Sequence, residues 1–131
     1  MIGVDTNILA RIFVDDGSPQ RQRALTYFSG AQREIAFVSI LVLVEFAWLL
    51  SSRYAFSRTA ILDAVSALLR NADFIVQRED LVIEALEHGY ARGVGIADFL
   101  ISRLSAEAGC SATLTFDREA ARKIPGMYLL K

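Results

Sequence analysis

Residues 40–50 of this chain read ILVLVEFAWLL, an apolar stretch in which Glu45 is the one charged side chain. Because the stretch is apolar around its whole circumference, we expect a helix that places Glu45 inside the protein or at the edge of its core. An ionised carboxylate is costly to bury unless a cation meets it, and no Lys or Arg lies within a helical turn. The pattern therefore predicts that Glu45 is protonated, paired with a distant residue, or bound to a metal ion.

Three further acids sit in similarly apolar settings, namely Asp5, Asp98 and Asp117. Each has a simpler explanation when taken alone. Asp5 and Asp98 could cap helices, and Asp117 could begin a helix and pair with Arg118. Glu45 has no such role in the middle of a helix. Taken together, the four carboxylates suggest one shared site.

The elements around these acids alternate between strands and helices. We expect strands at residues 1–4, 34–38, 74–76, 112–116 and 127–130, the first of them buried. Helices are expected over residues 6–14, 19–29, 40–53, 58–70, 78–92 and 98–109, with a short one after Asp117. Thr6 or Asn7 is the expected cap of the first helix. The alternation predicts a parallel sheet with helices on both faces, in which ligands bind beyond the carboxyl ends of the strands.

A cluster of carboxylates favours a divalent cation. Without one, mutual repulsion would drive some of the acids to take up protons. Oxygen-only ligands suit Mg²⁺ or Mn²⁺, and two such ions about 4 Å apart can serve phosphodiester cleavage. The side chains expected to orient the carboxylates or waters around them are Thr6, Asn7, Ser39 and Thr115.

The composition of the chain bears on its domain organisation, its partners and its cellular compartment. The 131 residues fit one domain, and the net charge of −1 gives no basic field of the kind that marks many nucleic-acid binders. Cys110 is the only cysteine, which excludes an internal disulfide and a thiolate zinc site. No leader-like segment opens the chain, and its longest apolar run is too short to span a bilayer. We therefore expect a cytoplasmic protein without membrane contact.

Other catalytic patterns are weak. His88 is the sole histidine and is interpreted as a surface or hydrogen-bonded side chain. There is no glycine-rich phosphate loop, and no serine lies in a nucleophile-elbow pattern. Trp48, Phe46 and Phe99 are expected in the core rather than as platforms for nucleobases. Metal-dependent hydrolysis is thus the chemistry that the residues favour.

The acids and their neighbours resemble a known family. Val4-Asp5-Thr6-Asn7-Ile8-Leu9, Val44-Glu45-Phe46-Ala47-Trp48, Ala97-Asp98-Phe99-Leu100-Ile101 and Thr115-Phe116-Asp117-Arg118 follow one another in the order seen in PIN-domain ribonucleases. Among these, the chain looks most like the VapC toxins of type II toxin–antitoxin systems. The resemblance extends over the whole length of the chain.

The resemblance implies a three-layer α/β/α fold with a central parallel sheet of four to five strands, formed as a single PIN domain over residues 1–131. It implies Mg²⁺- or Mn²⁺-dependent endonucleolytic cleavage of RNA, with Asp5, Glu45, Asp98 and Asp117 as metal ligands. A homodimer is expected, together with a VapB-like antitoxin whose C-terminal segment blocks the acidic cleft. Many relatives carry a further acid at the position of Gly95, a difference that bears on how tightly a second metal ion is held.

Arginines near the acids are candidates to hold the RNA backbone, namely Arg11, Arg103 and Arg118. Two other classes of function stay open on the sequence alone. One is an aspartyl-phosphate phosphatase or receiver-like protein, although Asn7 stands where such phosphatases carry a second Asp. The other is a non-catalytic module whose acids dock an arginine-bearing partner.

Overall fold

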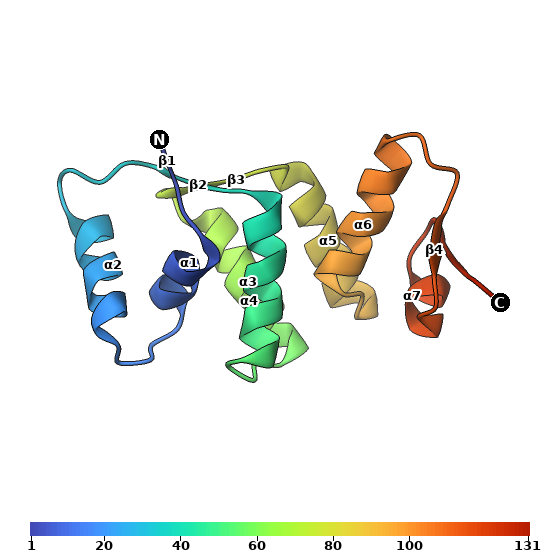
Figure 1. Cartoon of the computed structure of the whole chain (residues 1–131), viewed down its shortest axis with the longest axis horizontal. Coiled ribbons are helices and arrows are strands. Elements are labelled where there is room, and N and C mark those ends of the chain that lie inside the picture. Colours follow the sequence, from blue (N-terminus) through green and yellow to red (C-terminus); the bar gives the residue numbers. More distant parts are fainter. The chain divides into compact units, whose positions relative to one another are not determined.

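The computed structural model describes all 131 residues, and the chain divides into two compact units, residues 1–78 and 79–131 (Figure 1). Strands and helices alternate along both units, as the sequence predicts. Every strand pairs in parallel with its neighbour. The fold class is therefore α/β with parallel strands. None of the helices has the length and apolarity needed to cross a membrane.

The first unit contains strands β1 (Ile2–Gly3), β2 (Ala36–Val38) and β3 (Phe74–Val76), which form a sheet in the order β1-β2-β3. Its helices are α1 (Thr6–Phe13), α2 (Pro19–Ser29), α3 (Ile40–Ser52) and α4 (Arg58–Arg70). Serine side chains cap α2, α3 and α4 at residues 18, 39 and 57, each accepting a hydrogen bond from a backbone N–H of the first turn. All three caps agree with the helix starts expected from the sequence.

The four helices of the first unit lie on one side of its sheet (Figure 1). Ala36, Val38 and Val76 are buried, whereas Ile75 is exposed. Successive side chains of a strand point to opposite faces of the sheet, so Ile75 lies on the face opposite to Val76. The expected burial of the first strand is wrong, because both residues of β1 are exposed. A strand of two residues at the edge of a sheet has a neighbour on one side only, so little of its surface is covered.

The second unit contains α5 (Glu79–Arg92), α6 (Ile96–Glu107), β4 (Thr113–Thr115), α7 (Arg118–Lys123) and β5 (Met127–Leu129). Strands β4 and β5 form a two-stranded parallel sheet. Helix α5 buries Leu81, Ala85 and Leu86, whereas Tyr90 is exposed. Helix α6 begins at Ile96, two residues before the predicted start.

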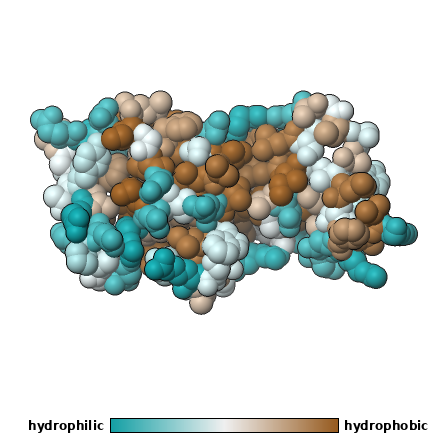
Figure 2. Space-filling view, viewed as in Figure 1, coloured by the Kyte–Doolittle hydropathy of each residue, from teal (hydrophilic) through white to brown (hydrophobic).

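Helix α3 shows where an all-apolar sequence misleads. Leu43, Phe46 and Leu50 are fully buried, and they mark one face of the helix. Glu45 and Trp48 lie on the opposite face and are exposed. The expectations that Glu45 starts inside the protein and that Trp48 belongs to the core are therefore wrong. Figure 2 shows hydrophobic residues gathered over the part of the surface that α3 forms.

Gly126 offers a test of the second unit. Its φ is +87°, and a Cβ at this position would lie 3.0 Å from Ser102 Oγ, which donates a 2.8 Å hydrogen bond to the carbonyl of Pro125. We expect Gly126→Ala to lower the free energy of unfolding by about 1–3 kcal/mol, because the backbone conformation is strained for any side chain. Gly3→Ala is the control, since nothing lies within 4 Å of its Cβ. Equal denaturant midpoints for the two variants would contradict the assigned turn.

Candidate active site

Asp5 ends the loop after β1 and caps α1. Its Oδ1 accepts a 2.9 Å hydrogen bond from the backbone N–H of Ile8. The alternative that Asp5 caps this helix is therefore confirmed, and the expectation that Thr6 or Asn7 is the cap is wrong. Thr6 is buried in the first turn, whereas Asp5 and Asn7 are exposed. Capping uses one carboxylate oxygen and leaves Oδ2 for another ligand.

Glu45 stands in the middle of α3 on the face turned away from the apolar core of the first unit. It makes no hydrogen bond or ion pair there. Ser39 begins the same helix, and its Oγ accepts from the backbone N–H of Val42 at 3.2 Å. Glu45 is thus an exposed, unpaired carboxylate on a helix whose first turn is capped by Ser39.

Asp98 lies in the first turn of α6 and is partly buried. The residue that precedes this helix as its cap is Gly95, so the alternative that Asp98 caps the helix is wrong. A Cβ at Gly95 would lie 3.4 Å from Asp98 Oδ2, so the carboxylate packs closely over the glycine. An acid at the Gly95 position would place a second negative charge beside Asp98.

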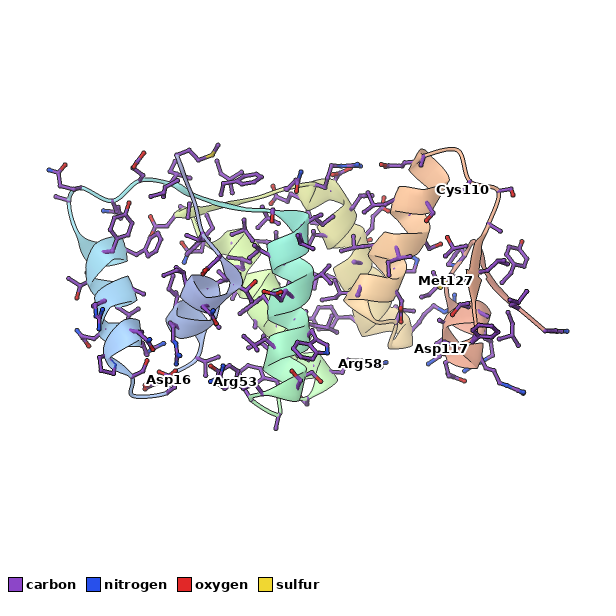
Figure 3. All side chains as sticks on the ribbon, in the orientation of Figure 1. Asp16, Arg53, Arg58, Cys110, Asp117 and Met127 are labelled. Atoms are coloured by element: carbon purple, nitrogen blue, oxygen red, sulfur yellow. The ribbon has the colours of Figure 1, made fainter.

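Burial raises the pKa of the Asp98 carboxyl above its ordinary value, and the negative charge of Asp117 raises this pKa further. The second unit therefore brings two of the four predicted acids close enough to repel one another. Asp117 sits at the start of α7 (Figure 3), where its Oδ1 accepts from the backbone N–H of Ala120 at 3.0 Å. The backbone N–H of Asp117 in turn donates a 3.0 Å hydrogen bond to Thr115 Oγ1, which fixes its position.

No group of three or more His, Cys, Asp or Glu side chains is arranged to hold a metal ion. Asp5 and Glu45 belong to the first unit, and Asp98 and Asp117 belong to the second. The four-carboxylate site therefore stays a proposal. The oxygen-only donors and the repulsion between Asp98 and Asp117 fit a divalent cation, because such an ion would relieve that repulsion.

The three candidate arginines differ in whether their guanidinium groups are already paired with an acid. Arg11 is hydrogen-bonded to Asp16, and Arg103 forms a 3.2 Å ion pair with Glu84. Arg118 is exposed and makes no ion pair, so the suggested pairing with Asp117 is absent. Arg118 is thus the candidate with a guanidinium available for a phosphate group.

His88 has a structural explanation. Its Nδ1 lies 3.0 Å from the carbonyl oxygen of Glu84, and its ring centroid lies 4.5 Å from that of Phe99. The interpretation of His88 as a hydrogen-bonded side chain is confirmed. Phe46 and Phe99 are buried as expected, so Trp48 is the one aromatic residue of the three that was misplaced.

The raised pKa of Asp98 predicts a pH-dependent stability. Between the ordinary value of 3.8 and the higher folded value, the folded chain keeps a proton that the unfolded chain has lost. Stability therefore falls as pH rises through this window and stays reduced above it. In EDTA at pH 7, we expect Asp98→Asn to unfold at a higher temperature than the wild type. The difference should vanish below the ordinary aspartate pKa, and a lower unfolding temperature at pH 7 would contradict this electrostatic picture.

A family model described as the PIN domain matches residues 2–125, which is nearly the whole chain. The chain belongs to the PIN domain family. This places it in a family of nucleases, and the resemblance seen in its sequence is confirmed at the level of the family.

Among solved structures, the chain is similar to VapC20 of Mycobacterium tuberculosis, described as a toxin that cleaves the sarcin-ricin loop. The two are 19% identical, the match covers 93% of this chain and 94% of VapC20, and the TM-score is 0.46. With so low a score, membership of the PIN domain family rests on the family model alone. No curated protein sequence matches the chain.

Proposed function

We propose that this chain is a Mg²⁺- or Mn²⁺-dependent endoribonuclease and the toxin of a VapBC-like toxin–antitoxin pair, in which residues 1–131 act as a single PIN domain. The observation that carries the proposal is the match of residues 2–125 to the PIN domain family model, and the repulsion between the carboxylates of Asp98 and Asp117 supports it. Such a pair of carboxylates suits a nuclease because it can bind a divalent cation, and the bound cation can then attract a phosphate group. Membership of the PIN domain family supports the same reaction class.

The proposed metal ligands are Asp5, Glu45, Asp98 and Asp117. When bound, the metal would activate a water molecule and stabilise the charge that develops on the phosphodiester. The protein would hold these carboxylates in place through its helix starts: Asp5 is fixed by its bond to the N–H of Ile8, and Asp117 by its bonds to Ala120 and Thr115. Preorganised ligands lower the cost of assembling the reacting groups.

Arg118 would contact the RNA backbone next to the scissile bond. It follows Asp117 directly and has no partner of its own. A guanidinium binds phosphate through two parallel hydrogen bonds, which orients the group for in-line attack by water. Attack on phosphorus with departure of the 3′ oxygen would leave a 5′-phosphate on one fragment and a 3′-hydroxyl on the other.

Regulation would follow from the charge of the site. We propose that a cognate antitoxin covers the acidic cleft with its C-terminal segment, and that two copies of the chain form a homodimer in the cytoplasm. A cationic segment suits this role because it would compete with the metal for the same carboxylates.

The test is cleavage of total cellular RNA by antitoxin-free protein in Mg²⁺ or Mn²⁺. We expect discrete fragments whose 5′-phosphates permit direct ligation of an adaptor, so that sequencing maps each cut. RNA that stays intact with folded protein would contradict the proposed activity. Fragments that end in a 2′,3′-cyclic phosphate would contradict the metal-dependent mechanism.

A further inference from the structure

Trp48 is exposed beside a proposed metal ligand. Its exposed fraction is 65%, and it follows Glu45 by three residues on α3. Side chains three apart in a helix lie on the same face, with Cβ atoms about 5–6 Å apart. The indole makes no hydrogen bond and no contact with another ring. A large aromatic side chain is thus displayed, without a partner, one helical turn from a carboxylate of the candidate site.

We propose that Trp48 is a stacking platform for a nucleobase of single-stranded RNA, next to the phosphate bound at Glu45. This inference rests on the proposed ribonuclease activity and gives Trp48 a role in holding the RNA strand. Proteins that bind single strands stack unpaired bases on aromatic side chains, whereas bases inside a duplex are not accessible to such stacking. Because every base has a π-face, the platform would hold the strand without choosing its sequence.

An alternative occupant of this face is an apolar protein partner, since Leu41 is also exposed there, at 76%. Glu45 lies between Leu41 and Trp48 on the same face and has no cation beside it. Covering this face with an apolar partner would bury an unpaired carboxylate, which is costly. RNA bound through a metal ion would instead use that charge. The central position of Glu45 therefore favours RNA.

The chain offers an intrinsic probe, because Trp48 is its only tryptophan. Asp98→Asn protein, which we expect not to cut, is titrated with a single-stranded oligoribonucleotide about 12 nucleotides long, within the range of known single-strand sites. We expect saturable quenching of Trp48 fluorescence. The same strand annealed into a duplex should leave the fluorescence unchanged, because its bases are already stacked.

Cleavage kinetics on the same oligonucleotide separate stacking from general apolar contact. Stacking energies of the usual size predict that Trp48→Ala weakens binding, and so raises KM, by about 5- to 150-fold. Trp48→Phe keeps an aromatic ring and should recover most of the loss. Leu41→Ala removes a neighbouring apolar side chain of similar exposure and should behave as the wild type.

The outcomes also separate this inference from the activity on which it rests. If the wild type cuts RNA and Trp48→Ala cuts it with the same KM, the stacking role is wrong while the ribonuclease proposal stands. Equal losses for Leu41→Ala and Trp48→Ala would overturn the role as well, in favour of an apolar docking face. If the wild type cuts no RNA, the proposed function itself fails.

Discussion

Replacing Asp98 with asparagine is expected to lower the rate of RNA cleavage at least about 100-fold while leaving the chain folded. Loss of residues that merely support a metal ligand commonly costs about 10- to 100-fold, and loss of a ligand should cost at least as much. Asp98 is partly buried and is repelled by Asp117, so keeping its carboxylate ionised in the folded second unit costs free energy. Initial rates on one mapped substrate, with circular dichroism to check the fold, measure this effect.

Glu87→Gln is the matched control. Glu87 is an exposed acid on α5 of the same unit, so its substitution removes one negative charge without touching the candidate site. We expect this variant to cut RNA at the rate of the wild type. If both variants lost activity equally, the loss would reflect net charge rather than a specific ligand. Full activity of folded, metal-loaded Asp98→Asn protein would remove Asp98 from the site.

Removal of divalent metal is expected to abolish cleavage entirely. Excess EDTA should reduce fragment formation to the level seen without protein, and added Mg²⁺ or Mn²⁺ should restore it. The physical reason is that carboxylates alone repel both one another and the RNA phosphate, so they bind substrate only with a cation between them. The cleavage rate is measured against free metal concentration at constant ionic strength. A rate that does not change in EDTA would contradict metal-dependent hydrolysis.

Local features of the fold followed from the sequence because they depend on neighbouring residues. Serine caps at residues 18, 39 and 57 set the starts of α2, α3 and α4 at the predicted positions. The strands were predicted by short apolar runs, and all five are present. Their pairing in a three-stranded and a two-stranded sheet depends on contacts between distant segments, which single-sequence patterns do not specify.

Glu45 and Trp48 show the limit of hydrophobicity alone. In an apolar helix, every side appeared suited to the core, yet Leu43, Phe46 and Leu50 define the buried face. The charge of Glu45 is the one signal that marks the opposite face, and helical periodicity then places Trp48 beside it. The closeness of Asp98 and Asp117, by contrast, arises from the packing of α6 against β4, the strand that precedes Asp117, so no local pattern reveals it.

The central claim is that the carboxylates bind a divalent metal ion, and a Mn²⁺ titration followed by electron paramagnetic resonance tests it most directly. Free Mn²⁺ gives a signal that disappears on binding, so the fraction bound is counted without RNA or catalysis. We predict saturable binding to the wild type and to Glu87→Gln, and at least about 10-fold weaker binding to Asp98→Asn. Wild-type protein that binds no Mn²⁺, or binds it as tightly after Asp98→Asn, would contradict the proposed metal site.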